Sequence, residues 1–113
     1  MSECIFCKIV KKQVPSDIVY EDEDIIAFKD INPGAPVHIL IVPKVHISSL
    51  NELADTELAG KMILAAKKVA KMYNIDKSGY KLIVNTGEGA GQLVRHIHMH
   101  LLGGGDKSKW RIP

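Results

Sequence analysis

Three histidines occupy alternate positions near the C-terminal end of the chain, in the segment RHIHMHLLGGG at residues 95–105. They are His96, His98 and His100. An imidazole binds transition metals through a neutral nitrogen and can act as a nucleophile or an acid near neutral pH. On a strand, residues two apart point to the same face, about 6.6 Å apart. The spacing therefore predicts one face lined by imidazoles and an opposite face lined by the intervening apolar residues.

A nearly straight row of three imidazoles is poorly shaped for one metal ion, because every nitrogen would have to lie within about 2.1 Å of the same centre. Two of the three could share an ion. Each ring could also make only a local hydrogen bond, or the row could supply a nucleophile, a proton donor and contacts to an anionic oxygen. The preceding segment NTGEGAGQ contains Gly87, Gly89 and Gly91, whose backbones can turn N–H groups toward a phosphate. This neighbour favours phosphate chemistry.

The two cysteines form the motif CIFC, at Cys4 and Cys7. In a reducing compartment, a pair with this spacing is more typical of metal ligands or a redox site than of a structural disulfide. A redox motif is disfavoured because the expected βαβ pattern does not surround it. Two free thiols packed as small apolar residues are the remaining alternative.

The elements that must position these residues follow from periodicity and turn signals. Residues 4–10 predict a short helix, and a helix begins at Asp55 or Thr56 and carries one apolar stripe as far as Tyr73. Residues 18–22 and 25–31 predict a hairpin, and the loop NPGAP separates it from an inner strand at 37–43. A strand at 80–85 precedes the histidine strand. This order predicts one α+β domain, residues 1–113, with an antiparallel sheet.

Composition excludes several classes of function. The chain has 113 residues, 46% of them hydrophobic, which suits one compact core. A formal net charge of +2 gives no strong field for nucleic acid or an anionic membrane. No apolar run of about 20 residues and no secretory leader is visible, so we expect a cytoplasmic protein with no membrane or nucleic-acid partner.

The segment HIHMHLLGGG, together with VHILIVPKVHI and NTGEGAGQ, resembles the histidine triad family, whose signature alternates histidines with apolar residues. The segments CIFCKI and AFKDINPGAP and the residue Trp110 also look like its nucleotide-binding branch, so the resemblance covers nearly the whole chain. Proteins of that branch are purine nucleoside phosphoramidate hydrolases. The resemblance implies a five-stranded antiparallel sheet with one short and one long helix, in a homodimer with a continuous sheet.

The resemblance also implies catalytic roles. His98 takes the place of the histidine that attacks an α-phosphorus and forms a nucleotidyl-imidazole intermediate, which water then cleaves. His100 takes the place of the last triad histidine, on the phosphate and leaving-group side, and His38 matches the fourth, upstream histidine. A backbone carbonyl holds the proton-bearing nitrogen of the attacking ring in the family. The sequence does not reveal that contact.

Further positions match the family's nucleotide-binding residues. Asp30 matches the carboxylate that binds the ribose hydroxyls. The phosphate-side loop is matched by Asn85, Gly91 and Gln92, and the apolar slot for the base by Ile5, Phe6, Ile9, Phe28, Ile31 and Leu40. Leu93 departs from the eukaryotic pattern, in which a serine commonly follows GQ and can donate a hydrogen bond on the leaving-group side.

Family members that begin with CxxC use the histidine after VPK and the first triad histidine as further ligands, which are His46 and His96 in this chain. With Cys4 and Cys7, they would form a closed Cys2His2 set that suits structural zinc and ties the N-terminal helix to the sheet. His96 would then serve zinc, while His98 and His100 serve phosphate.

Three hypotheses follow. The first is a hydrolase that cleaves the P–N bond of purine nucleoside 5′-phosphoramidates, such as AMP-lysine or aminoacyl-adenylate-like substrates, with AMP or GMP as the bound nucleotide and no metal needed for the chemistry. The second is a nucleotide-binding or scaffolding protein whose weak hydrolysis is incidental. The third is a metal-dependent hydrolase with catalytic zinc on the histidine row.

Overall fold

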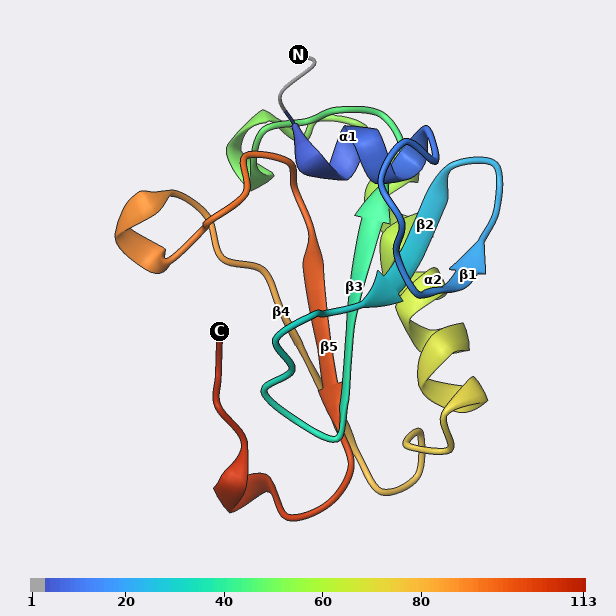
Figure 1. Cartoon of the computed structure of the whole chain (residues 1–113), viewed down its shortest axis with the longest axis vertical. Coiled ribbons are helices and arrows are strands. Elements are labelled where there is room, and N and C mark those ends of the chain that lie inside the picture. The colour runs from blue at the N-terminus through green and yellow to red at the C-terminus, as the bar shows by residue number, and fades with distance from the viewer. Residues whose placement is uncertain (1–3) are drawn as a thin grey trace.

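The computed structural model describes residues 4–113, which form a five-stranded antiparallel sheet and two α-helices. The strands are β1 (Ile18–Glu21), β2 (Ile25–Lys29), β3 (Val37–Pro43), β4 (Tyr80–Ile83) and β5 (Met99–Gly103), and their order in the sheet is β1-β2-β3-β5-β4. The helices are α1 (Ile5–Val10) and α2 (Thr56–Met72), and α2 lies behind the sheet in the view of Figure 1. The predicted α+β class, the hairpin and both helices are confirmed.

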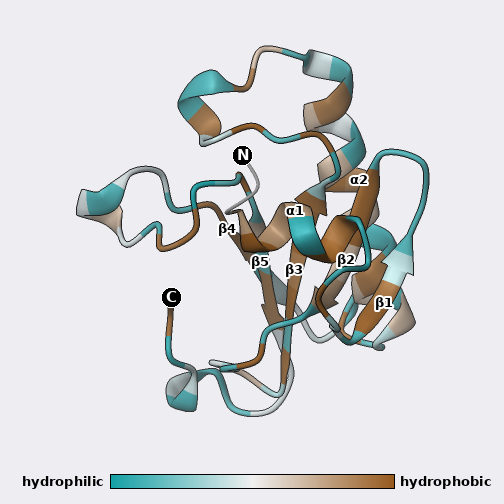
Figure 2. Ribbon diagram, turned by 45° about the horizontal axis from the view of Figure 1, so that its top comes forward, coloured by the Kyte–Doolittle hydropathy of each residue, from teal (hydrophilic) through white to brown (hydrophobic). Residues whose placement is uncertain are grey.

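The alternation of side chains divides the sheet into two faces, because successive residues of a strand point in opposite directions. Odd-numbered residues of β2, β3 and β5, such as Ala27, Ile41 and Leu101, pack with the buried side of α2. Even-numbered residues, such as Phe28 and Leu40, pack with α1. Both faces of these three central strands are therefore covered, and Figure 2 shows them coloured as hydrophobic over most of their length.

Helix α2 begins where the sequence predicts. Asp55 is its N-cap, and the carboxylate accepts hydrogen bonds from the backbone N–H groups of Glu57 and Leu58. The buried stripe that follows consists of Leu58, Met62, Ala65, Ala66, Val69 and Ala70. Helix α1 is capped by Cys4, whose sulfur accepts a hydrogen bond from the backbone N–H of Cys7. Both cysteines are thereby held in the first turn of α1.

The prediction for the histidine strand was wrong at its beginning, because β5 starts at Met99. Pro43 has no N–H to offer the ladder, and the pairing of β3 with β5 ends at Ile41 opposite Met99. Ile97 instead donates its N–H to the carbonyl of Ile47. The backbone stays extended, so His96 and His98 still lie on the α1 side of the sheet while Ile97 joins the core beneath α2. Strand β4 also ends early, at Ile83.

The C-terminal tail folds back along the loop that joins β2 to β3. The indole N–H of Trp110 donates to the carbonyl of Gly104, and the backbone N–H of Arg111 donates to the carbonyl of Gly34. The side chain of Arg111 donates to the carbonyl of Pro33. Two hydrogen bonds from Arg111 therefore join the tail to this loop, and the bond from Trp110 holds the tail against the residue that follows β5. In residues 4–113, no helix has the length and apolar character needed to cross a membrane.

Candidate active site and metal centre

His98 and His100 lie side by side on the sheet face that α1 shares, with ring centroids 5.0 Å apart. The Nδ1 atom of His98 is 2.8 Å from the backbone carbonyl oxygen of His96. A carbonyl oxygen only accepts hydrogen bonds, so Nδ1 of His98 carries the proton. The other ring nitrogen, Nε2, is then an unprotonated lone pair. This is the proton arrangement that a nucleophilic imidazole requires.

His100 has the opposite arrangement, which begins at the loop between β2 and β3. The backbone N–H of Gly34 donates to Nδ1 of His38 over 2.8 Å, so the proton of a neutral His38 ring is on Nε2. That Nε2 is 2.9 Å from Nδ1 of His100. Nδ1 of His100 therefore accepts, and the proton of His100 is on Nε2. The row presents one nitrogen that can attack and one N–H that can donate.

Asp30 completes this group at the end of β2. Its carboxylate oxygen Oδ2 lies 3.3 Å from Nε2 of His38, and Oδ1 accepts the backbone N–H of Asn32. The shorter contact of His38 is the one to His100. Among residues 4–113, the only polar contact of Asp30 Oδ2 is thus this long one to His38, and the side chain is 19% exposed, so Oδ2 can accept from a ligand hydroxyl.

All three of these histidines are neutral near pH 7. Burial lowers the pKa of His38, although the charge of Asp30 opposes the shift. Burial is also the main cause that lowers the pKa of His98. For His100, burial and then the neighbouring His98 and His38 rings lower the pKa to about 4. Neutral rings are needed for the proton arrangement described above.

The glycine-rich loop, which precedes the histidine row in the chain, bends around the short helix η2 (Glu88–Ala90). Gly87 and Gly91 have φ angles of 86° and 87°, which L side chains rarely adopt. The amide of Gln92 accepts from the N–H of Gly87 and donates to the carbonyls of Ser48 and Val94. These internal bonds occupy Gln92, one of the expected phosphate-side residues. Its observed contacts hold the loop in shape.

The other residues expected on the phosphate side of this loop are more open. Asn85 is half-buried and Gly91 is exposed. Leu93 is 92% exposed.

The expected apolar slot divides into two parts. Four of its members, Phe6, Ile9, Phe28 and Leu40, form one buried cluster on the α1 face. The Phe6 ring makes T-shaped contacts with Phe28 and with His98, at centroid distances of 5.4 and 5.1 Å. Ile5 is 40% exposed and Ile31 is fully exposed. The buried members are core of the sheet, whereas Ile5 and Ile31 present apolar surface to solvent.

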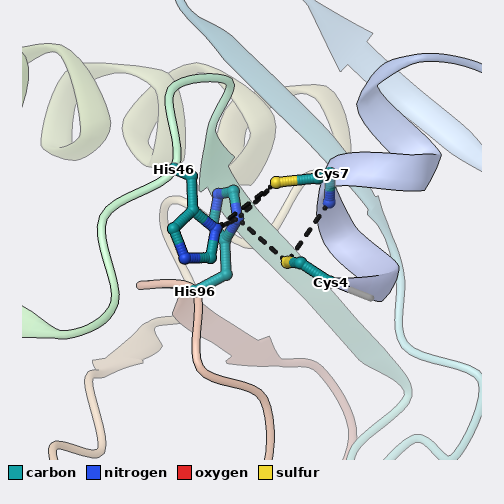
Figure 3. A group of neighbouring side chains, drawn as sticks. All are labelled: Cys4, Cys7, His46 and His96. Carbon is teal, nitrogen blue, oxygen red and sulfur yellow. Dashed lines mark hydrogen bonds between the residues drawn. The ribbon is translucent and has the colours of Figure 1, made fainter. Parts of the chain in front are cut away.

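The expected metal ligands do come together. The side chains of Cys4, Cys7, His46 and His96 point toward one another from α1, from the loop after β3 and from the segment before β5 (Figure 3). Nδ1 of His96 is 3.4 Å from the sulfur of Cys4 and 3.6 Å from that of Cys7. Nδ1 of His46 is 3.3 Å from the sulfur of Cys7 and 3.2 Å from Nδ1 of His96.

These distances fit a tetrahedral metal centre. Zinc bonds of about 2.0–2.1 Å to nitrogen and about 2.3 Å to sulfur place tetrahedral ligand atoms about 3.3–3.8 Å apart. Nε2 of His96 lies 2.8 Å from the carbonyl of Pro43, to which it donates its proton, so Nδ1 faces the sulfurs as a lone pair. The group can hold a metal ion, and the donor set of two thiols and two imidazoles suits zinc.

A second group of ligand-type residues consists of Asp30, His38 and His100. Its inward-facing nitrogen on His38 is the protonated Nε2, because the N–H of Gly34 occupies Nδ1. A metal at this nitrogen would require the proton to move to Nδ1, where it would oppose another N–H. The hydrogen bonds therefore favour proton donation at this group over metal binding. His96 is thus in the first group and His100 in the second.

Two backbone groups that complete the site could not be identified from residue types. They are the N–H of Gly34, which sets the proton on His38, and the carbonyl of Pro43, which sets the proton on His96. Every residue has a backbone carbonyl and nearly every residue has a backbone N–H, so a residue's type does not indicate that its backbone makes such a contact. Only the fold shows which of them reaches a ring.

Comparison with known proteins identifies the family. Residues 11–107 match the family model described as HIT domain, and the chain belongs to this family. It is 52% identical over 104 residues to a purine nucleoside phosphoramidase of Escherichia coli (strain K12), covering 90% of this chain and 87% of that protein. It is also 49% identical over 108 residues to a 14 kDa zinc-binding protein of Zea mays, covering 91% and 83%.

Solved structures agree with this assignment. A HIT family hydrolase from Clostridium thermocellum superimposes with a TM-score of 0.90 and 51% sequence identity, covering 94% of each chain. The five-stranded antiparallel sheet with two helices is thus the HIT fold, and the comparisons support a hydrolase of the HIT family. The resemblance deduced from HIHMHLLGGG is confirmed.

Proposed function

We propose that this protein hydrolyses the P–N bond of purine nucleoside 5′-phosphoramidates, of the AMP-lysine or aminoacyl-adenylate-like kind. The observation that carries the proposal is the pair of opposite proton arrangements on neighbouring rings. His98 presents the Nε2 lone pair because its Nδ1–H is held by the His96 carbonyl, and His100 presents an Nε2–H. A bond to phosphorus can be made at one ring while a proton is given at the other.

The proposed reaction has two displacements at phosphorus. In the first, Nε2 of His98 forms a bond to the α-phosphorus while the bond from phosphorus to the leaving nitrogen breaks, and that nitrogen takes the proton from Nε2 of His100. The negative charge left on the His100 ring is balanced by the positive charge of the N-phosphorylated His98 ring, which keeps its Nδ1–H. In the second, water attacks the same phosphorus, its proton returns to His100, and the bond to His98 breaks. The products are a nucleoside monophosphate and an amine, and both rings regain their starting proton positions.

The remaining residues of the site bind the substrate in this proposal. Asp30 accepts hydrogen bonds from the ribose hydroxyls, since its side chain is 19% exposed and, among residues 4–113, its Oδ2 atom has only the long contact to His38. Ile5 and Ile31 border the purine above the buried cluster that contains Phe28 and Leu40. Asn85 and the backbone at Gly91 face the phosphate, while Gln92 keeps the loop closed.

We propose structural zinc at Cys4, Cys7, His46 and His96. The supporting observation is the set of ligand distances, all near those of a tetrahedral Cys2His2 site. A site with four protein ligands has no open position, so zinc would stabilise the attachment of α1 to the sheet. It would take no part in the displacement at phosphorus.

We also propose a homodimer. Strand β4 is at the edge of the sheet, where it presents unpaired backbone groups that a second strand could pair with. On α2, Ile63 and Leu64 are 48% and 56% exposed, which leaves apolar surface uncovered. A second copy that continues the sheet at β4 could cover it. The test is a measurement of the molecular mass in dilute solution. The mass of a monomer at micromolar concentration would contradict the proposed dimer.

The experiment that tests the hydrolase is turnover of a fluorogenic adenosine phosphoramidate by the wild-type protein and by His98→Asn and His98→Ala variants. We expect both variants to lose turnover, and we expect mass spectrometry of protein quenched during turnover to find AMP or GMP attached to His98. Hydrolysis by either variant at the wild-type rate would reject the mechanism.

A second function is favoured by one observation, the exposed Leu93 in the segment that precedes the histidine row in the chain. A leucine side chain has no donor for a leaving group, which would suit a nucleotide-binding protein with weak incidental hydrolysis. Tight AMP binding with negligible phosphoramidate turnover, in protein with intact His98, would select this function over the first.

A further inference from the structure

His96 contacts both the proposed metal-binding side chains, which are Cys4, Cys7 and His46, and the proposed nucleophile, His98. Its ring contributes Nδ1 to the metal group, at 3.2–3.6 Å from the donor atoms of Cys4, Cys7 and His46. Its backbone carbonyl accepts the Nδ1–H of His98 over 2.8 Å. The carbonyl that determines which nitrogen of His98 is free therefore belongs to a residue whose side chain is a metal ligand.

A second connection runs through α1. Cys4 caps this helix and Cys7 lies in its first turn. Phe6 lies between them in the sequence, and its ring makes T-shaped contacts with both His96 and His98, at centroid distances of 5.9 and 5.1 Å. Any change that releases the two sulfurs from His46 and His96 also loosens the helix that packs Phe6 on His98.

We propose that His96 is a positioning residue for the nucleophile, and that metal bound at Cys4, Cys7, His46 and His96 acts on turnover through it. This inference rests on the proposed function. When Cys4, Cys7, His46 and His96 hold a metal ion, the ring of His96 is fixed at both nitrogens. The metal ion would hold Nδ1, and the backbone carbonyl of Pro43 accepts the proton of Nε2. The adjacent carbonyl is then fixed, and His98 keeps its proton on Nδ1.

Loss of the metal leaves His96 with the single anchor at Pro43. Its backbone can then rotate, and the His98 proton can exchange between the two ring nitrogens. Only the form with a free Nε2 attacks, so kcat falls. Asp30, the residue proposed to bind the nucleotide, directly follows β2 and belongs to the group with His38 and His100 instead of the metal group, so KM for the phosphoramidate stays near its original value. A purely structural metal would lower stability alone.

The test uses the full chain and two ligand variants from different elements, Cys7→Ser on α1 and His46→Asn in the loop after β3. The variant Val69→Ala is the control, because Val69 is a buried residue of α2, which packs on the opposite face of the sheet, and its truncation lowers stability away from the row. Metal content, melting temperature, kcat, KM and the ¹⁵N chemical shifts of the His98 ring are measured for each protein with and without added zinc.

We expect both ligand variants to lose kcat by roughly 10-fold or more, the range typical of residues that orient a reactive group. We expect KM to change less than about 3-fold, and the His98 ring to show a mixture of the two neutral tautomers. Excess zinc should restore kcat and the Nδ1–H tautomer together in His46→Asn, which keeps three ligands. Val69→Ala should lower the melting temperature with kcat and tautomer unchanged.

The inference is overturned if the metal-free variants melt at lower temperature but keep the wild-type kcat and a pure Nδ1–H tautomer. It is also overturned if Val69→Ala reproduces their loss of kcat at equal loss of stability. The tautomer measurement needs no substrate, so it decides the link between metal and His98 even if the wild-type protein fails to hydrolyse phosphoramidates. That failure would reject the proposed function alone.

Discussion

Two groups of ligand-type residues lie on the same face of the sheet. They differ in the backbone hydrogen bond made by the outer nitrogen of a histidine in each group, and this bond determines which chemistry the group favours. In the metal group, the outer nitrogen of His96 donates to a carbonyl, which leaves the inner nitrogen as a lone pair. In the group of Asp30, His38 and His100, the outer nitrogen of His38 accepts from the N–H of Gly34, which leaves the inner nitrogen protonated. One backbone atom therefore decides whether an imidazole serves a metal or a proton.

The comparison also explains why the two groups coexist without interference. Both include buried histidines and an anionic or potentially anionic partner, so a metal could in principle enter either one. The N–H of Gly34 opposes metal at the second group, while the thiols of Cys4 and Cys7 favour soft metals at the first. His98 stands between the groups and belongs to neither.

Among tests of the difference between the two groups, we expect the largest effect on zinc binding and stability from removing both thiols. We expect the double variant Cys4→Ser/Cys7→Ser to lose bound zinc entirely, whereas His38→Asn and His100→Asn retain one zinc per chain. The free energy of unfolding should drop by several kcal/mol in the double variant, because metal binding contributes directly to folding. Elemental analysis and chemical denaturation measure the two effects. If His38→Asn lost as much zinc as the double cysteine variant, zinc would not be confined to the group of Cys4, Cys7, His46 and His96, and the comparison would fail.

Acidification should affect the second group through His100. Because the pKa of His100 in the folded protein is about 4, below about 6.5 in an unfolded chain, the unfolded state binds more protons between these values. The stabilisation of the neutral ring is complete above about pH 6.5 and is lost as the pH falls toward 4. The total for this residue is up to about 3 kcal/mol.

Urea denaturation across this pH range measures the slope, and the variant His100→Asn provides the reference. We expect the wild type to lose more stability than the variant between pH 6.5 and 4. Parallel curves for the two proteins would mean that His100 is not held neutral by its surroundings.

Much of this architecture is predictable from the sequence because it depends on side-chain type and period. The apolar stripe of α2, its cap at Asp55 and the alternation of His96, His98 and His100 are local patterns, and each is found in the structure. The start of β5 was misplaced because the ladder depends on Pro43, a residue of another strand.

The proton positions were beyond prediction for a related reason. They depend on backbone groups of Gly34, Pro43 and His96, which reach the rings only after the chain has folded. The family resemblance implies that His98 is the attacking histidine, which stays a proposal. The structure supplies the reason that its Nε2 is available.

The contact of Gly34 gives a sharper test of the second group. A Cβ atom at this position would collide with the backbone carbonyl oxygen of Arg111, so Gly34→Ala must displace the loop or the C-terminal tail. The N–H of Gly34 would then move away from Nδ1 of His38. The proton of His38 would no longer be confined to Nε2, and the hydrogen bond that keeps the proton of His100 on Nε2 would be weakened. We expect phosphoramidate turnover to fall roughly 10- to 100-fold, as for other residues that orient a reactive imidazole.

Zinc content should not change in Gly34→Ala, because the residue has no contact with the metal group. The matched control is Gly60→Ala on the exposed side of α2, where an added Cβ meets no atom within 4 Å. That variant should keep full turnover and gain about 0.5–1 kcal/mol of stability from higher helix propensity. Normal turnover in Gly34→Ala would show that His38 keeps its proton position without this N–H.

The smallest effect is expected at Leu93, which lies outside both groups. The side chain is 92% exposed, so Leu93→Ser should change the free energy of unfolding by less than about 0.5 kcal/mol. Its hydroxyl could donate to the leaving group beside His100, which would raise kcat a few-fold for substrates with a poor leaving amine and leave AMP binding unchanged. Kinetics with a series of amines of increasing basicity measures this difference. A gain that is equal for all amines would instead assign the serine to phosphate binding, because phosphate contacts are shared by every substrate in the series.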